Sequence, residues 1–186
     1  MKTSTTIKLM ILFTIFLLSV TVGFYVLFNV YGKDYMRILY ITFLTIFYHF
    51  AMRLFVGETV TVIYKNREFN IDSFGFKIRS FEPRLYKFLK VKKWKIKVIT
   101  AKPEQFDLTK VSKEELLHNM LQAELVHRII MVLSFLPLLL IIPYGCPSVF
   151  ILTSVFACLI DLIFVIIQRY NRPRIIRLIA RTSNKN

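Results

Sequence analysis

The chain has 186 residues, of which 55% are hydrophobic, and its mean hydropathy of +0.55 is unusual for a soluble domain. A formal charge of +15 accompanies this hydrophobicity, whereas a nucleic-acid-binding protein needs a soluble basic face. The combination is ordinary for a membrane protein whose cytoplasmic surface is rich in lysine and arginine. We therefore expect an integral membrane protein that binds no nucleic acid.

Four apolar runs are long enough to cross about 30 Å of hydrocarbon, which takes roughly 20 residues of helix. They lie at residues 7–30, 38–56, 119–143 and 149–167. The first run is longer than the apolar core of a secretory signal, about 7–15 residues, so we predict that it is a membrane anchor. The sequence predicts an all-α membrane protein with four transmembrane helices, in which residues 1–186 form a single integral membrane domain.

Basic residues are distributed unevenly among the connections. The insertion 57–118 between the second and third runs holds fourteen lysines and arginines, and the tail 168–186 holds six. The connection after the first run holds only Lys33 and Arg37, and residues 144–148 hold none. The positive-inside rule then predicts a multi-pass protein of the plasma membrane with both termini and the insertion in the cytoplasm.

The first part of the insertion alternates between apolar and other residues. This pattern covers residues 59–64, is interrupted by charged residues, and resumes over residues 69–78. Alternation of this kind is typical of strands that are exposed on one face, so a short β-hairpin is predicted here.

A basic segment follows at residues 81–95. Leu85, Phe88 and Leu89 fall on one helical face and basic residues cover the rest, which predicts an interfacial helix with Trp94 at headgroup depth. Two interpretations remain open. The helix either anchors the chain to anionic lipid, at about 1 kcal/mol per basic residue, or it contributes to an active site, in which Trp94 binds substrate.

Ionisable residues inside a span are costly and are therefore candidates for function. Glu124 and His127 are three residues apart near the cytoplasmic end of the third run, so they share a helical face. A histidine oriented by a carboxylate can take a proton from a hydroxyl, which acyl transfer to that hydroxyl requires. Alternatively, Glu124 pairs with Arg128 at i,i+4 and His127 is an interfacial polar residue.

A second polar group involves the second and fourth runs. His49 and Arg53 lie near the cytoplasmic end of the second run, where an arginine can extend to the interface. His49 lies deeper and needs a polar partner, for which Asp161 in the fourth run is the candidate. We predict that these three residues bind substrate in a polar pocket on the cytoplasmic side.

A donor-rich heptapeptide begins where the fourth run ends. Arginine is well shaped to hold phosphate or carboxylate through paired donors. Pro173 is predicted to push Asn171 and Arg172 out of regular helix. The result is a predicted non-helical elbow that binds an anionic headgroup or an acyl carrier. Its predicted substrate-binding residues are Gln168, Arg169, Tyr170, Asn171, Arg172 and Arg174.

Motifs for several other chemistries are missing from the sequence. Cys146 and Cys158 do not make a metal-binding or disulfide framework. Zinc motifs, glycine-rich phosphate loops and the Gly-x-Ser-x-Gly elbow of hydrolases do not occur. No metal and no tightly bound cofactor is predicted.

Three motifs together carry a resemblance to a known family: Lys-Lys-Trp-Lys at 92–95, Ala-Glu-Leu-Val-His at 123–127, and the heptapeptide 168–174. In this order and spacing, the chain resembles the glycosyl-4,4'-diaponeurosporenoate acyltransferases, which esterify a glucose hydroxyl with a fatty acyl chain in staphylococcal carotenoid synthesis. The resemblance covers about residues 82–178. It implies transfer of a fatty acyl group to a hydroxyl of a lipid or glycolipid acceptor, with acyl-CoA or an acyl carrier as co-substrate and membrane lipids as partners.

Within this interpretation, His127 is the general base and Glu124 orients it, while Arg169, Arg172 and Arg174 hold donor phosphates or the oxyanion. Another lipid-modifying membrane enzyme is an alternative, because small enzymes of the isoprenylcysteine methyltransferase type, or reductases, also place Arg and Tyr after their last spans. A lipid-binding protein without activity is a third possibility, and it predicts that Glu124 and His127 are dispensable. The sequence does not predict an oligomeric state.

Overall fold

The computed structural model describes residues 5–65, 67–95, 98 and 103–183. Four helical stretches in these ranges are long and apolar enough to cross a membrane. They are α1 (Thr5–Tyr31), α2 (Asp34–Tyr64), the stretch Lys113–Tyr144 and α7 (Pro147–Ser183). Each contains one of the four predicted apolar runs, so the prediction of four helices that can span a membrane is confirmed.

The stretch Lys113–Tyr144 consists of three helical pieces. These are α5 (Lys113–Leu133), the 3₁₀ helix η3 (Leu136–Leu140) and α6 (Ile141–Tyr144). Pro137 in η3 has no N–H to donate, which favours the end of regular α-helix just before it. Gly145 and Cys146 then both have positive φ angles, +67° and +54°, and reverse the chain before α7 begins.

The chain divides into two compact units, and α2, α5 and α7 contribute residues to both. One unit comprises Met1–Glu58 and Ile129–Asp161, and the other comprises Thr59–Arg128 and Leu162–Asn186. The description of residues 1–186 as one integral membrane domain stays a prediction.

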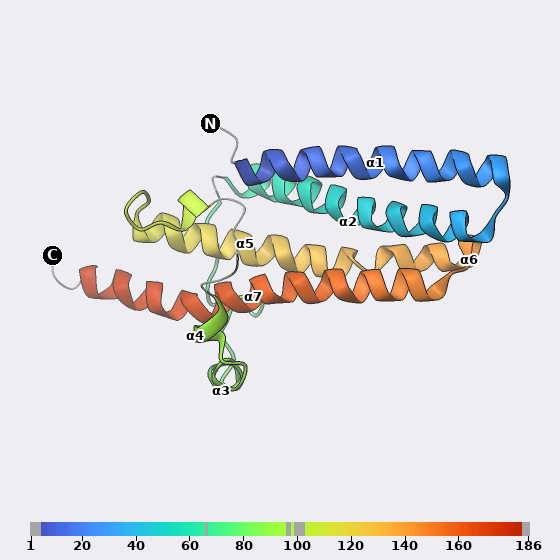
Figure 1. The fold of residues 1–186 in the computed structure, drawn as a ribbon. Helices are drawn as coiled ribbons and strands as arrows, with labels where there is room; N and C mark the ends of the chain where they lie inside the picture. Colours follow the sequence, from blue (N-terminus) through green and yellow to red (C-terminus); the bar gives the residue numbers. More distant parts are fainter. Residues whose placement is uncertain (1–4, 66, 96–97, 99–102, 184–186) are drawn as a thin grey trace. The chain divides into compact units, whose positions relative to one another are not determined.

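In the first unit, α1 and α2 are joined by a tight turn at Gly32, whose φ is +61° (Figure 1). Aromatic rings pack between them: the centroids of Phe13 and Phe50 lie 4.9 Å apart, and those of Phe24 and Phe43 lie 5.4 Å apart. The large apolar side chains on the other faces of α1 are exposed, as expected of a surface that faces lipid.

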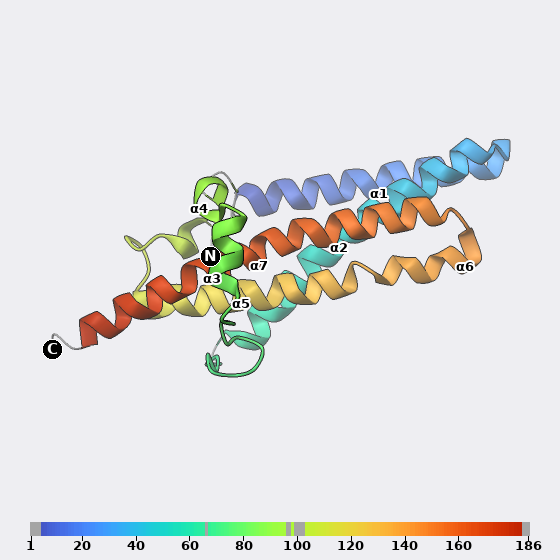
Figure 2. The same ribbon diagram turned by 90° about the horizontal axis from the view of Figure 1, so that it is seen from below.

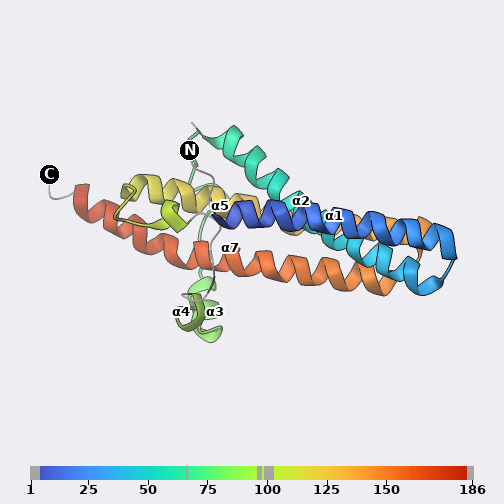
Figure 3. The same ribbon diagram turned by 45° about the horizontal axis from the view of Figure 1, so that its top comes forward.

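In the second unit, the start of α5 packs on the last part of α7 (Figure 2) through buried Leu116, Met120 and Ile175. The short 3₁₀ helix η2 (Pro103–Phe106) precedes α5. Two short helices, α3 (Glu82–Phe88) and α4 (Val91–Trp94), lie beside α7 (Figure 3). The insertion is thereby held against the two helices that carry the predicted site.

The predicted β-hairpin is wrong. Residues 59–64 form the last turns of α2, and the described part of residues 65–81 contains turns but no strand. Met52, Val56 and Val60 are buried at every fourth position of α2, so the apolar face has the helical period. In addition, Gln122 of α5 donates a hydrogen bond to the Thr61 hydroxyl, 2.9 Å away. Packing along the helix outweighs the β-propensity of this segment.

The single interfacial helix predicted over residues 81–95 is two helices, α3 and α4. They are separated at Lys90, which has a left-handed backbone with φ of +51°. The indole N–H of Trp94 donates to the carbonyl of Leu89, 2.9 Å away, and so satisfies a carbonyl near the end of α3. Trp94 has this structural contact, and its depth in a membrane stays a prediction.

The predicted non-helical elbow is also wrong, because α7 continues through Pro173 to Ser183. A proline inside a helix costs about 3 kcal/mol, which neighbouring interactions must offset. Arg169 and Arg172, on the turn before Pro173, are fixed by ion pairs to buried carboxylates. The heptapeptide therefore presents its side chains at helical spacing rather than from a loop.

Candidate functional site

Glu124 of α5 is fully buried and is the acceptor for three arginines. Its Oε1 accepts from Arg169 at 2.7 Å and lies 3.2 Å from an Nη of Arg128, while its Oε2 accepts from Arg172 at 2.6 Å. The i,i+4 pair of Glu124 with Arg128 was expected from the sequence and is confirmed. The two arginines from α7 were expected to bind a ligand, and in the structure they contact this carboxylate.

Arg169 uses every N–H donor that its guanidinium has. Nε and one Nη2 hydrogen bind the two oxygens of Glu82 at 2.9 and 2.5 Å, and Nη1 binds Glu124. The two remaining donors bind the backbone carbonyls of Gly75 and Lys77 at 3.3 and 2.9 Å. A guanidinium has five N–H donors, so Arg169 has none left for a ligand in this arrangement.

Glu82, at the start of α3, ties the insertion to α7. Besides Arg169, it accepts from the Tyr86 hydroxyl at 2.5 Å and from the backbone N–H of Arg79 at 2.7 Å. Burial by itself would raise the pKa of Glu82, but the hydrogen bonds from Arg169, Tyr86 and Arg79 and the charge of Arg169 lower it to about 2. The carboxylate is thus charged at neutral pH. Burial raises the pKa of Tyr86, and the hydrogen bond from Tyr86 to Glu82 raises it further.

The stability of the protein should fall in acid as Glu82 gains a proton. Because its folded pKa of about 2 lies below its ordinary value of 4.5, the stabilisation is fully present above pH 4.5 and is lost as the pH falls toward 2. The thermal midpoint in detergent should therefore drop more steeply over this window for the wild type than for Glu82→Gln, which lacks the titrating carboxyl. Parallel slopes for the two proteins would contradict the assignment.

Arg172 is 1% exposed and completes an ion cluster of five residues. We use this name for Glu82, Glu124, Arg128, Arg169 and Arg172, whose formal charges sum to +1. One Nη of Arg172 donates to the Phe76 carbonyl, and its guanidinium carbon lies 5.8 Å from the centre of the Phe76 ring. Its Nε has no hydrogen-bond partner among the described residues. The cluster thus holds α5, α7 and the insertion together.

His127 lies one turn after Glu124 on α5 and is half-buried. Its ring stacks on that of Phe164 in α7, with centroids 4.5 Å apart and planes 6° apart. Stacking fixes the plane of the imidazole. A histidine held in this way is able to act as a base once an acceptor hydroxyl lies within hydrogen-bond reach. That Glu124 and His127 are catalytic stays a prediction.

The polar group predicted around His49 lies in the first unit. Arg53 donates to a carboxylate oxygen of Asp161 at 2.5 Å, to the Ala157 carbonyl at 3.2 Å and to the His49 carbonyl at 2.9 Å. The two ring nitrogens of His49, which is 4% exposed, have no hydrogen-bond partner among the described residues. Asp161 was the expected hydrogen-bond partner of His49 and is instead bonded to Arg53. The planar guanidinium of Arg53 offers a buried carboxylate several donors and a delocalised charge.

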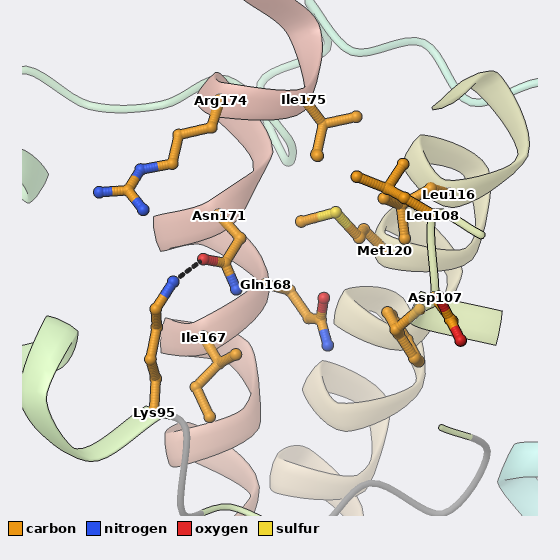
Figure 4. Close-up of a pocket in the computed structure, with 11 residues that line it drawn as sticks. Lys95, Asp107, Leu108, Leu116, Met120, Ile167, Gln168, Asn171, Arg174 and Ile175 are labelled. Carbon is orange, nitrogen blue, oxygen red and sulfur yellow. Dashed lines mark hydrogen bonds between the residues drawn. The ribbon is translucent and has the colours of Figure 1, made fainter. Parts of the chain in front are cut away.

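A cavity of about 550 Å³ lies in the second unit, along α7 and next to α5 (Figure 4). Three of the predicted substrate-binding residues line it: Gln168, Asn171 and Arg174. Figure 4 shows Lys95 and Arg174 on one side of α7, and Leu116 and Met120 on the other. The cavity therefore has a basic side and an apolar side.

Two cations of this cavity share one aromatic ring. Lys95 and Arg174 lie 4.8 and 5.0 Å from the centre of the Tyr170 ring, and Arg174 also bonds the Tyr170 hydroxyl at 3.1 Å. Lys95 donates to the Asn171 side chain at 2.5 Å. Burial and then the charges of Arg174 and Lys92 lower the pKa of Lys95. Neither Lys95 nor Arg174 pairs with a carboxylate among the described residues.

Sequence reasoning missed Glu82, Phe76 and Lys95 as parts of the site. Glu82 carried one signal, because it stands directly before Pro83 at the start of a helix, where an acidic residue is favourable. Lys95 ends the Lys-Lys-Trp-Lys motif at 92–95 but was given no role in the site, and Phe76 carries no local signal, since its role comes from contact with Arg172 of α7. No group of three or more His, Cys, Asp or Glu in the described residues is arranged to hold a metal.

Comparison with models of known protein families gave a match. The sequence model of glycosyl-4,4'-diaponeurosporenoate acyltransferase matches residues 63–181, well over half of the chain. Searches of curated proteins and of solved structures gave no match. The matched range contains all five residues of the ion cluster, His127 and the residues that line the cavity.

Proposed function

Because the chain belongs to the glycosyl-4,4'-diaponeurosporenoate acyltransferase family, we propose that it moves a fatty acyl group to a hydroxyl of a lipid or glycosylated lipid at the cytoplasmic leaflet. The observation that carries this proposal is the family match, which spans both helices of the candidate site. Four helices able to cross a membrane support an acceptor that is itself a membrane lipid. The donor is acyl-CoA or an acyl carrier.

His127 acts as the general base. It takes the proton of the acceptor hydroxyl while the hydroxyl oxygen forms a bond to the thioester carbonyl carbon, and the imidazolium then returns that proton to the departing sulfur. The carbon–sulfur bond breaks, so the products are one ester and one thiol. The stacking of His127 on Phe164 at 4.5 Å supports this role, because it restricts the ring to one plane.

Glu124 does not touch substrate in this mechanism. It holds three arginines in place near the base. It lies three residues before His127 on the same helical face and is bonded to Arg128, Arg169 and Arg172. A preorganised set of buried charges needs no rearrangement when negative charge develops on the reacting carbonyl. Arg169 and Arg172 serve this purpose from within the ion cluster, and Arg174 is the arginine available to a donor.

The proposed placement has both termini in the cytoplasm of a plasma-membrane protein. It is supported by the basic residues of the insertion and the tail. In a background with both native cysteines replaced by serine, a cysteine at Lys33 should react with an impermeant thiol reagent added outside intact cells. A cysteine at the exposed position Lys110 should react only after permeabilisation. The opposite pattern would reverse the topology.

The reaction is tested by comparing the lipids of cells that express the wild type with those of cells that express His127→Ala. The wild type should produce a species heavier than an existing glycolipid or lipid by one acyl chain, and the variant should not. A methylated or reduced lipid in place of an acylated one would contradict acyl transfer and favour another lipid-modifying enzyme. Unchanged lipids with every acyl donor supplied would favour a binding protein without activity.

A further inference from the structure

The cavity beside α7 contains polar groups that have hydrogen-bonding capacity left over among the described residues. Gln168 is 5% exposed and lines the cavity, yet its amide makes no hydrogen bond with any described residue. Asn171 accepts one bond from Lys95, and its own N–H donors make no bond to a described residue. Amide groups that line a cavity and have donors to spare can bond a ligand that enters it.

The charge on the basic side of the cavity is also unbalanced. Lys95 and Arg174 share the Tyr170 ring, and no carboxylate of the described part of the chain pairs with either. One acidic residue lines the cavity, Asp107, but its Oδ1 accepts from the backbone N–H and hydroxyl of Thr109, and its Oδ2 lies 3.8 Å from Lys110. The unused groups are therefore mainly donors and cations, which suits a ligand with acceptor oxygens and negative charge.

The opposite side of the cavity suits a hydrocarbon chain. Its lining includes Phe106, Leu116, Met120 and Ile175, and three of these residues form the buried core between α5 and α7. The volume of about 550 Å³ falls within the range of roughly 300–1,000 Å³ of small-molecule sites. Apolar lining with a few convergent polar groups is the usual composition of such sites.

We propose that this cavity is the binding site of a fatty acyl thioester, with the acyl chain on the apolar side, the thioester oxygen at the amides of Gln168 and Asn171, and the anionic carrier group at Lys95 and Arg174. The assignment rests on the proposed function, for which it names the donor site. A neutral glycolipid acceptor fits less well, because it brings no charge to the two cations. Free fatty acid and anionic phospholipid share the required chemistry and are separated by experiment.

Photolabelling of the purified full-length protein in neutral detergent tests this assignment. The probe is palmitoyl-CoA with a diazirine near the end of its acyl chain, and labelled peptides are mapped by mass spectrometry. The label should fall on the α5 and α7 residues that line the cavity, around Met120 and Ile175. Unlabelled palmitoyl-CoA should displace the probe at lower concentration than either palmitate or phosphatidylglycerol does. Label spread along α1, or equal displacement by the three competitors, would overturn the assignment.

A matched pair of variants tests whether the anionic carrier group binds at Arg174. Hydrogen bonds to charged groups contribute about 1.5–3 kcal/mol, so Arg174→Glu should raise the Kd of palmitoyl-CoA by roughly tenfold to a hundredfold. Arg177→Glu changes the net charge equally on the same exposed stretch of α7, outside the cavity, and should change the Kd by less than about threefold. Equal effects of the two variants would overturn the assignment.

The cavity assignment and the proposed function can fail separately. If the protein binds the probe in the cavity but forms no ester, the proposed function is overturned and the cavity is still supported as a thioester site.

Discussion

Replacing Arg169 by leucine should lower the free energy of unfolding by about 3–5 kcal/mol, the usual cost of removing one partner from a buried ion pair. The variant removes the cation bonded to buried Glu82 and one of the three arginines that contact buried Glu124, and it frees two backbone carbonyls. The free energy of unfolding of Arg169→Lys should lie between those of the wild type and the leucine variant, because an ammonium keeps the charge but has at most three donors. Denaturant unfolding in detergent micelles measures all three proteins.

Arg177→Leu is the matched control for this experiment. Arg177 is exposed on the same helix, and its only described bond is to the Pro173 carbonyl. The control should change stability by no more than about 0.5 kcal/mol, as is usual for surface substitutions. If Arg169→Leu cost no more than Arg177→Leu, the ion cluster would not be what holds the insertion to α7.

Replacing His127 by glutamine should lower kcat by about 10²–10⁴-fold, the contribution of a general base, while KM for the acyl donor changes little. Glutamine keeps a polar side chain of similar size but cannot accept the proton. The experiment measures initial rates with purified protein and a thioester donor, and thermal unfolding checks that the variant is folded.

A structural role for His127 predicts a different outcome. Loss of the stacking with Phe164 would then reduce stability and activity together. Phe164→Leu is the control, because it removes the stacking partner and leaves the imidazole in place. It should reduce the rate far less than His127→Gln does. If His127→Gln kept full activity, the base would be another residue, and His49 would be the next to replace.

The apolar runs were enough to predict the four long helices, because a run of about 20 apolar residues has few alternatives to a membrane-spanning helix. The ends of the helices were harder to predict. Residues 59–64 alternate in the manner of a strand, but buried Val60 and the bond from Gln122 to Thr61 make them part of α2. Such contacts come from residues distant in sequence, which local patterns do not contain.

The candidate site was predictable in its residue types and not in its pairings. Glu124, Arg169 and Arg172 stood out as ionisable residues at the ends of apolar runs, and the structure brings them together. Their partner Glu82 lies in the insertion, where a single carboxylate among many charges is not distinctive. Pro173 suggested a break in the helix. However, α7 continues through Pro173, and Arg169 on the preceding turn is held by ion pairs. As a result, two of the three arginines expected to hold a ligand, Arg169 and Arg172, are bonded to carboxylates.

The most direct test of acyl transfer is to follow both products of one reaction with purified protein in lipid vesicles. Palmitoyl-CoA serves as donor and a glucosylated lipid as acceptor, with free thiol measured by a colorimetric reagent and acylated glycolipid by mass spectrometry. The account predicts one thiol released for each ester formed, and no thiol release when the acceptor is left out. Release of thiol without ester formation would show hydrolysis, and no release with any acceptor would show a protein that binds acyl chains without transferring them; either result would contradict the account.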